Sequence, residues 1–393
     1  MPVAPSPELP STEQQAPARL AVTRLTLTDF RCYVRERLEL DARPVVLAGP
    51  NGAGKTNLLE AVSFLVPGRG LRRARLAEAA RRDGPGTWGV AAHLVGANGR
   101  TEVGTGREPA GPDVARERRA VRIDGEAAKG QAALGAVASA VWLTPRMDRL
   151  FMDGGGARRR FLDRLVFASD PAHAGRVTAY DNALRDRARL LKDAAADATW
   201  LDALEHTMAE KGVAVAAARH HMAVRLDAVA ATAAGPFPGA RVRLIGTVED
   251  WLAEMPALAV EDRLRAALAS ARTRDAESGG AAVGPQRSDM DVVHTGKEIA
   301  ARDCSTGEQK ALLIALILAH ARLLADEQGT LPLLLMDEVA AHLDGQRREA
   351  LFERLLALDV QAWLTGTDAD LFASFESRAQ HFRVEDAAVR VAS

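Results

Sequence analysis

Apolar and polar residues alternate regularly in the first part of the chain, as they do in β-strands. Residues 20–33 (LAVTRLTLTDFRCY) predict a half-buried strand, and the apolar run PVVLAG at 44–49 predicts a short, fully buried one. A helix is predicted from Asn57, after the glycine-rich loop that follows this run. Residues 87–96 and 119–128 predict further strands, and the second of these contains a hairpin turn.

Helix-forming residues dominate from about 151 to 235, with apolar positions at helical spacing. Predicted breaks at Asp170-Pro171 and Ala198-Thr199 divide this region into two or three long helices. Beyond it, the pattern predicts a strand at 241–248 and another helix at 261–277.

An α/β pattern returns at Ile299, so a helical insert divides one α/β domain into two blocks of sequence. The predicted fold class is therefore α/β with an inserted α-rich lobe. Its predicted parts are a disordered tail at 1–19, a first α/β block at 20–150, the α-rich lobe at 151–298 and a second α/β block at 299–393. The tail is predicted from its content of Pro, Ser and Gln.

Composition narrows the class of protein but not its activity. The 393 residues are 47% hydrophobic and 26% charged, which is typical of a soluble globular protein. The net charge of -1 provides no overall field for nucleic acid, so a polyanionic partner would need a local basic patch. Cys32 and Cys304 form no disulfide framework. The apolar run 311–319 is too short to cross a bilayer, so we expect a cytoplasmic protein without membrane contact.

A phosphate-binding loop lies between the strand at 44–49 and the helix that follows. The loop fits the pattern G-x-x-x-x-G-K-[ST], and its residues are Gly49, Pro50, Asn51, Gly52, Ala53, Gly54, Lys55 and Thr56. Lys55 is predicted to reach the β and γ phosphates of ATP, and the Thr56 hydroxyl to bind Mg²⁺. The alternative is a glycine-rich turn without function, against which the flanking strand and helix argue.

Two adjacent carboxylates follow the apolar run LPLLLM at 331–336. Asp337 and Glu338 are then placed at the C-terminal tip of a buried strand, where α/β sheets bind ligands. Asp337 is predicted to hold Mg²⁺ through water, and Glu338 to act as the general base on the attacking water. Taken alone, the pair fits a buried strand that ends in a solvated acidic turn equally well.

The stretch CSTGEQKALLIALILAHARLL at 304–324 predicts an apolar helix whose first turn contains Ser305, Gly307 and Glu308. The free N–H groups of such a helix start attract an anion. A simple N-cap by Ser305 is the alternative, and it is compatible with anion binding. It does not explain why a phosphate loop, a helical insert, this helix and the Asp-Glu strand follow one another in this order.

This order resembles that of the ABC-type P-loop ATPase heads of the SMC superfamily and, within it, the RecF family of recombination-repair proteins. The resemblance extends over residues 20–372 and is carried by the segments DFRCY, GPNGAGKTNLLEAV, RRRFLD, YDNALRDRARLLKD, GPQRSD, CSTGEQKALL and MDEVAAHLD. It implies an ATP- and Mg²⁺-dependent homodimer in which the nucleotide lies between the phosphate loop of one subunit and Ser305, Gly307 and Glu308 of the other. It also implies that Asp344, in the turn after the Asp-Glu strand, contacts the partner subunit.

The resemblance further implies a switch protein that binds double-stranded and gapped DNA and works with RecR, RecO and RecA in SOS-linked repair. The water-positioning groups of many relatives are replaced here by Arg146, Asp148 and Thr365, so we expect weak, DNA-stimulated ATP hydrolysis and no nuclease activity. A transporter ATPase subunit and an SMC-like DNA tether are the alternatives. The helical insert is longer than a transporter ATPase subunit would require, and it is too short for the long coiled coil of an SMC-like tether.

Arginines are concentrated just after the predicted phosphate-loop helix. In a chain of near-zero net charge they are the predicted contact for the DNA backbone, and the candidates are Arg69, Arg72, Arg73 and Arg75. A solvated basic surface without a ligand is the alternative. Only two tyrosines are present, which favours duplex recognition over stacking on single strands.

Overall fold

The computed structural model describes residues 17–108, 119–192, 197–232 and 235–392. Of the tail predicted at 1–19, residues 1–16 lie outside these ranges. Its last two residues form β1 (Ala18–Arg19), which pairs in parallel with β13 (Thr330–Leu331). Arg19 also forms an ion pair with Asp359. These two residues are therefore part of the α/β domain, in contrast to the prediction.

The first large sheet is parallel except for one edge strand, and its order is β17-β16-β4-β15-β14-β9. In chain order its strands are β4 (Val45–Ala48), β9 (Ala140–Leu143), β14 (Leu333–Met336), β15 (Ala362–Gly366), β16 (Gln380–Glu385) and β17 (Ala388–Val391). β4, β9, β14 and β15 consist of buried residues, as expected for parallel strands covered on both faces. Because β15 lies between β4 and β14, the segments that leave these three strands meet at one edge of the sheet.

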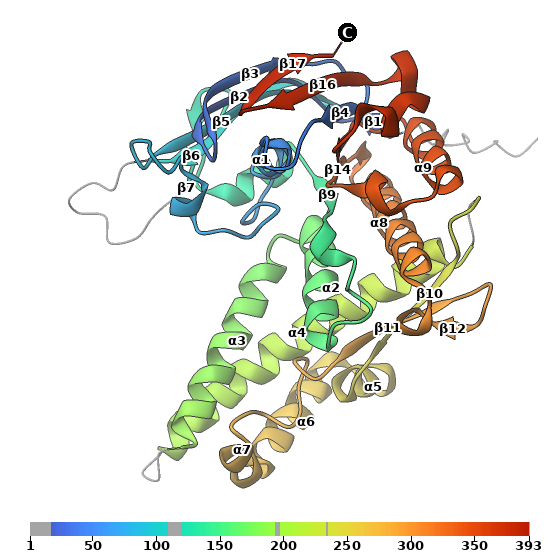
Figure 1. Ribbon diagram of the computed structural model, residues 1–393. Helices are drawn as coiled ribbons and strands as arrows, with labels where there is room; N and C mark the ends of the chain where they lie inside the picture. The colour runs from blue at the N-terminus through green and yellow to red at the C-terminus, as the bar shows by residue number, and fades with distance from the viewer. Residues whose placement is uncertain (1–16, 109–118, 193–196, 233–234, 393) are drawn as a thin grey trace, which may run out of the picture.

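The second large sheet is antiparallel and has the order β3-β2-β5-β6-β7-β8. Its strands are β2 (Ala21–Phe30), β3 (Tyr33–Glu39), β5 (Trp88–Gly96), β6 (Gly99–Arg107), β7 (Arg119–Ile123) and β8 (Glu126–Ala127). Helix α1 (Lys55–Ser63) lies between the two sheets (Figure 1). Its residues Leu58, Leu59 and Val62 are fully buried in a core to which both sheets contribute.

Helix α8 (Thr306–Gln328) covers the opposite face of the parallel sheet. Its residue Ile317 is buried in a second core together with Val46 and Leu364, which alternate along their strands with residues of the first core. Helix α9 (Gly345–Ala357) packs into the same core through Leu351. The parallel sheet is therefore enclosed between α1 and α8, which explains its uninterrupted apolar runs.

The chain between β9 and α8 forms a lobe of helices below the two sheets in Figure 1. The helices are α2 (Gly155–Ser169), α3 (His173–Leu190), α4 (Ala198–Ala230), α5 (Thr247–Glu254), α6 (Ala257–Ser270) and α7 (Arg272–Ser278). A small sheet of order β10-β11-β12 completes the lobe, with β10 (Ala240–Ile245), β11 (Asp289–His294) and β12 (Ile299–Ala300). None of the helices in the described ranges has the length and apolar content that crossing a bilayer requires.

Several predicted elements differ from the structure. The strand predicted at 241–248 ends at Ile245, because α5 begins directly after Gly246. The helix predicted at 261–277 is divided between α6 and α7, where the carbonyl of Leu268 accepts a hydrogen bond from Arg187. The last two strands, β16 and β17, were not predicted, although Phe382 and Val384 alternate with polar residues and are buried.

The GPQRSD loop at 284–289 is bound to several helices of the lobe. Arg219 of α4 donates to the carbonyl of Pro285 at 2.8 Å. The Ser288 hydroxyl donates to Glu249 of α5 at 2.7 Å. Arg158 of α2 donates to both carboxylate oxygens of Asp289, each at 2.7 Å. These contacts make the loop a joint between three helices, since it connects elements that are distant in the sequence.

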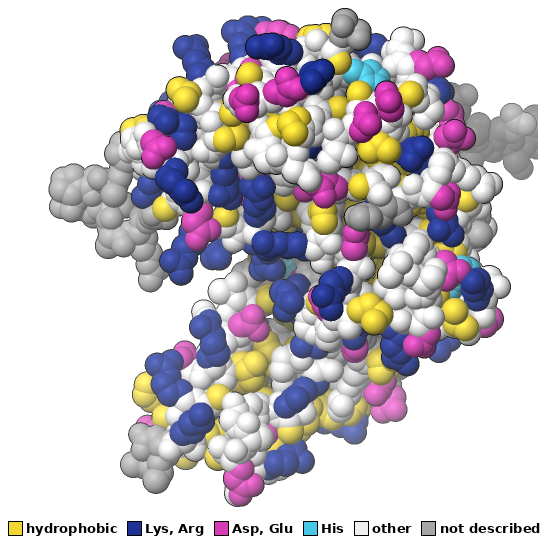
Figure 2. All heavy atoms as spheres, in the orientation of Figure 1, with side chains coloured by type: hydrophobic (Ala, Val, Ile, Leu, Met, Phe, Trp, Pro, Cys, Tyr) yellow, Lys and Arg dark blue, Asp and Glu magenta, His cyan; other side chains and the backbone are white. Residues whose placement is uncertain are grey.

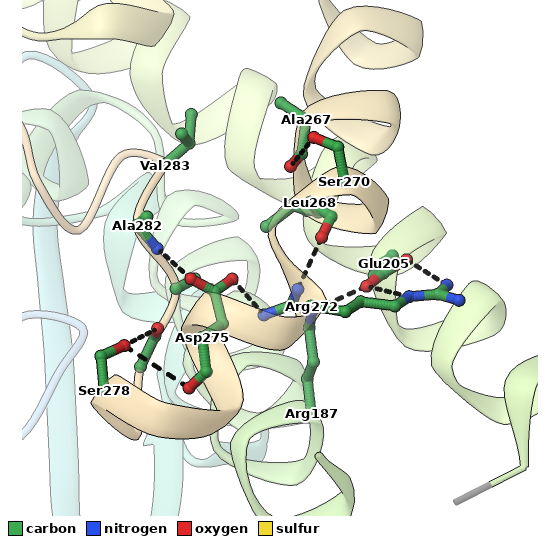
Figure 3. A network of polar contacts seen from close by, with 12 residues as sticks. Arg187, Glu205, Ala267, Leu268, Ser270, Arg272, Asp275, Ser278, Ala282 and Val283 are labelled. Atoms are coloured by element: carbon green, nitrogen blue, oxygen red, sulfur yellow. Dashed lines mark hydrogen bonds and ion pairs between the residues drawn. The ribbon is translucent and has the colours of Figure 1, made fainter.

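Four charged side chains form a buried network in the helical lobe (Figure 3). Arg187 of α3 is 1% exposed and donates to Glu205 and Asp275, each at 2.8 Å, and to the carbonyl of Leu268 at 2.7 Å. Arg272 donates to Glu205 from the other side. Arg272 is partly exposed and also pairs with Asp202. The network connects α3, α4, α6 and α7.

The substitution Arg187→Met should lower the free energy of unfolding by about 3–5 kcal/mol, because the carboxylate of Asp275 stays buried without its cation. Chemical denaturation followed by circular dichroism measures this loss. The matched control is Arg189→Met on the same helix, where the side chain is 79% exposed. The control should change stability by less than about 0.5 kcal/mol. Equal transition midpoints for the two variants would contradict a stabilising role of the network.

Candidate nucleotide-binding site

The phosphate loop connects β4 to α1 and depends on its glycines. Gly49 and Gly54 have φ values of 155° and 115°, which L side chains rarely adopt. A Cβ on Gly49 would lie 2.1 Å from the carbonyl oxygen of Val384, and one on Gly54 would lie 2.6 Å from the Tyr33 hydroxyl. A Cβ on Gly52 would meet no atom within 4 Å, so this glycine lies on the open side of the loop.

Lys55 is the first residue of α1, and its side chain folds back over the phosphate loop. Its Nζ donates to the carbonyl oxygens of Gly49 at 2.6 Å and Pro50 at 2.8 Å. Burial lowers the pKa of Lys55, while the nearby charges of Glu338 and Asp337 act in the opposite direction. The ammonium group is therefore placed among carbonyl oxygens and close to two carboxylates.

The Asp337 carboxylate joins the ends of three strand segments. Asp337 follows β14 directly and is 6% exposed. Its Oδ1 accepts one hydrogen bond from Thr56 Oγ1 at 2.9 Å and another from Thr365 Oγ1 at 2.8 Å. The role of Thr365 was missed by sequence reasoning, which treated it only as a replacement for another residue. Its place on β15, between β4 and β14, could be recognised only from the strand order.

Glu338 has a left-handed backbone conformation, with φ 50° and ψ 29°. Its N–H donates to Thr365 Oγ1 at 2.8 Å, which fixes this conformation. A non-glycine residue with positive φ costs free energy and is often found at functional sites. The strand therefore ends at this turn, where the Glu338 side chain is partly exposed.

The oxygen atoms of Thr56 and Asp337 fit a Mg²⁺ ion that is shared with phosphate groups. Mg²⁺ prefers oxygen ligands and is usually held by one or two protein groups together with substrate phosphates and water. A hydroxyl and a carboxylate 2.9 Å apart at the start of α1 meet this requirement. The glycine backbone and Lys55 supply the remaining positive groups for a nucleoside triphosphate.

The predicted signature residues lie at the start of α8. Ser305 is the N-cap, and its Oγ accepts from the Glu308 N–H at 3.4 Å, while Glu308 Oε2 accepts from the Ser305 N–H at 2.9 Å. Lys297 forms an ion pair with the same carboxylate. The bonds from Lys297 and Ser305 lower the pKa of Glu308 to about 2. Figure 1 places this helix start beside β12 and away from α1.

Asp344 is the N-cap of α9 and accepts a hydrogen bond from the Arg347 N–H at 2.8 Å. The Arg347 side chain lies against the signature helix, since a Cβ on Gly307 would lie 3.2 Å from its Nη1. Sequence reasoning did not identify Arg347, because no motif links it to residues forty positions earlier. The structure thus brings Asp344 and Gly307 close to one arginine.

The arginine-rich segment follows α1 and has two kinds of member. Arg72 donates to Glu60 at 2.8 Å and to Asn57 at 2.7 Å, so it is anchored to α1. Glu60 is fully buried and also binds Arg31 at 2.6 Å. The other members predicted to contact DNA are exposed, and they are Arg69, Arg73 and Arg75.

Arg164 of α2 lies close to Arg73, is partly buried and was not predicted. Its guanidinium lies over the rings of Trp142 and Phe161, 5.4 Å and 5.3 Å from their centroids. Burial lowers the pKa of Arg164 to about 10, and the charge of nearby Arg73 acts in the same direction. Within the described ranges, neither arginine forms an ion pair with a carboxylate.

The chain is similar to known proteins over nearly its whole length. The chain matches the family described as "RecF/RecN/SMC N terminal domain" over residues 21–389. It is 48% identical over 377 residues to "DNA replication and repair protein RecF" of Mesorhizobium japonicum, covering 95% of this chain and 98% of the relative.

Two solved structures are similar in fold. "Structure of the recombination mediator protein RecF-ATPrS in RecFOR pathway" superposes with a TM-score of 0.82 at 20% identity, covering 96% of this chain and all of the other. An SMC head bound to the C-terminal winged-helix domain of ScpA gives a TM-score of 0.51 at 15% identity, covering 94% and 96%. The fold is therefore that of an ABC-type ATPase head, as predicted.

The family model matches nearly the whole chain, and almost half of the aligned positions are identical to those of a relative of similar length. The chain belongs to the RecF family of DNA replication and repair proteins, within the RecF/RecN/SMC group of ATPases.

Proposed function

We propose that this protein is an ATP-dependent switch that binds double-stranded and gapped DNA as a homodimer. The observation that carries the proposal is the separate placement, within one chain, of α1, which follows the phosphate loop, and of α8 (Figure 1). No hydrogen bond or ion pair connects these two groups in the ranges that the structure describes. A second copy arranged head to tail would complete each nucleotide site with Ser305, Gly307 and Glu308.

In the proposed reaction, the oxygen of a water molecule attacks the γ phosphorus of ATP, and the bond to the β–γ bridging oxygen breaks. Glu338 accepts the proton of that water, and Lys55 stabilises charge on the phosphate oxygens. Mg²⁺, when bound through Thr56 and Asp337, neutralises phosphate charge. Hydrolysis should be slow, because Thr365 already donates to Asp337 and so cannot donate to a water there as well.

The DNA surface in this proposal is the hollow between the sheets and α3. Lys and Arg side chains are gathered on both sides of it (Figure 2). Arg73 and Arg164 contribute adjacent positive charges from the two lobes, and a DNA phosphate would relieve their mutual repulsion. Through family membership, we further propose that the protein acts with RecR and RecO to place RecA on single-stranded gaps. The RecFOR pathway named for the similar solved structure supports this assignment.

The substitution Lys55→Met should remove about 2–5 kcal/mol of ATP binding free energy, because the phosphates lose a buried cation. ATP should then no longer produce dimers. Isothermal titration calorimetry measures the binding, and sedimentation velocity measures the dimer. Lys211→Met, on the surface of α4, is the matched control and should behave like the wild type. A Lys55→Met variant that still dimerises with ATP would exclude the switch mechanism.

The substitution Glu338→Gln should slow ATP hydrolysis by roughly 100-fold or more, because the general base is lost while the ligands for Mg²⁺ remain. The ATP-bound dimer should consequently persist and leave duplex DNA more slowly than the wild type. Phosphate release and DNA dissociation kinetics test both effects. Glu353→Gln, at a side chain that is 62% exposed, is the control. Hydrolysis at the wild-type rate would assign the base to another residue.

Replacing Arg73 and Arg164 together by Gln should weaken duplex binding equally for different sequences. The slope of log K against log salt concentration should become shallower by about two, one for each lost phosphate contact. Fluorescence anisotropy over a salt series measures this slope. The control pair Arg378→Gln and Arg383→Gln, both exposed, should leave it unchanged. An unaltered slope in the test pair would place the DNA surface elsewhere.

A further inference from the structure

The starts of α8 and α9 lie next to each other, with the Arg347 guanidinium between them. Arg347 Nη1 is so near Gly307 that a Cβ there would lie only 3.2 Å away. Asp344 caps α9, and Ser305 caps α8. Each helix start carries a partial positive charge, so the two together create a local positive field around Arg347.

Other charges near this point are already paired. The Glu308 carboxylate accepts from the Ser305 N–H and Oγ, each at 2.9 Å, and forms an ion pair with Lys297. Glu308 therefore remains ionised but is neutralised by Lys297, which its lowered pKa reflects. An anion that approaches the start of α8 consequently meets little net repulsion from this carboxylate.

Arg347 is held much more weakly than Lys297. Its ion-pair partner in the described ranges is Asp344, with Nη1 and Oδ2 3.5 Å apart. The Arg347 side chain is 28% exposed. A guanidinium has five N–H donors in a planar fork that matches a phosphate group, so most of its capacity for hydrogen bonds is unused here.

We propose that Arg347 binds the terminal phosphate of the nucleotide held by the partner subunit. This inference rests on the head-to-tail dimer of the proposed function and adds a full positive charge to the partial positive charge of the helix start. Besides its predicted contact with the partner's nucleotide, Gly307 would then leave room for the guanidinium, because a Cβ there would press against Arg347 Nη1. Since ADP lacks the terminal phosphate, Arg347 would contribute to dimer stability only with ATP.

The substitution Arg347→Gln tests this role, with Arg348→Gln on the same helix as the control. Binding of a fluorescent ATP analogue to the monomer should be unchanged in both variants. With ATP, the dimer dissociation constant of Arg347→Gln should rise by about tenfold or more, since a charged hydrogen bond is lost. Arg347→Lys should recover part of this loss. Wild-type dimerisation by Arg347→Gln would overturn the proposal.

Mixed subunits test whether Arg347 acts on the partner's nucleotide. A dimer of Arg347→Gln with Lys55→Met has one site with an intact phosphate loop and an intact Arg347 from the other chain. The mixture should hydrolyse ATP faster than the sum of the two variants alone. Ser305→Arg mixed with Lys55→Met is the reference for the dimer itself. If ATP hydrolysis recovers in the reference but not in the test mixture, the proposed role of Arg347 is wrong, while the proposed dimer stands. Absence of recovery in both overturns the proposed dimer.

Asp344→Asn distinguishes phosphate binding from a role in positioning the turn before α9. If Arg347 binds phosphate, adding Arg347→Gln to Asp344→Asn should weaken the ATP-dependent dimer by about a further tenfold. If Arg347 serves only to hold Asp344, the double variant should be no weaker than Asp344→Asn, and the proposal is then wrong.

Discussion

The Asp337 carboxylate is the group on which the geometry of the nucleotide site depends. One of its oxygens accepts hydrogen bonds from Thr56 and from Thr365, which come from the start of α1 and from β15. Thr365 in turn accepts from the N–H of Glu338. These three bonds align the phosphate-loop helix with Asp337, the proposed metal ligand, and with Glu338, the proposed general base. They form only because β15 separates β4 from β14 in the sheet, so site geometry follows directly from strand order.

Sequence reasoning predicted the local structure correctly where it depends on neighbours along the chain. The phosphate loop, the Asp-Glu pair and the capped helix at Ser305 are each local patterns with a local physical cause, and the fold class followed from their order. It failed where function depends on elements that meet only after folding. Thr365 on β15 contacts Asp337 at the end of the neighbouring strand β14, and Arg347 at the start of α9 lies beside Gly307 at the start of α8. No spacing in the sequence encodes either contact. The unpredicted β16 lies beyond the last motif, although it pairs with β4.

The phosphate-loop helix and the arginine segment are connected mechanically through buried charge. Glu60 lies in the middle of α1 and binds Arg31, from the turn after β2, and Arg72, from the segment predicted to contact DNA. The arginine segment is thus attached to the same helix whose first turn is proposed to bind phosphate. A rotation of α1 would be transmitted to this surface, because breaking the pair with Arg72 removes one of the two cations that neutralise the buried Glu60 carboxylate. This connection is a physical basis for coupling between nucleotide and DNA.

The bonds of Lys55 to the carbonyl oxygens of Gly49 and Pro50 have a thermodynamic consequence for nucleotide affinity. When a phosphate binds, the ammonium group exchanges these two partners for phosphate oxygens, so only the difference between the two sets contributes to the binding free energy. The charge of Lys55 therefore contributes less to the binding free energy of a triphosphate than the charge alone would suggest. A smaller binding free energy of this kind would make a bound nucleotide easier to release from the site.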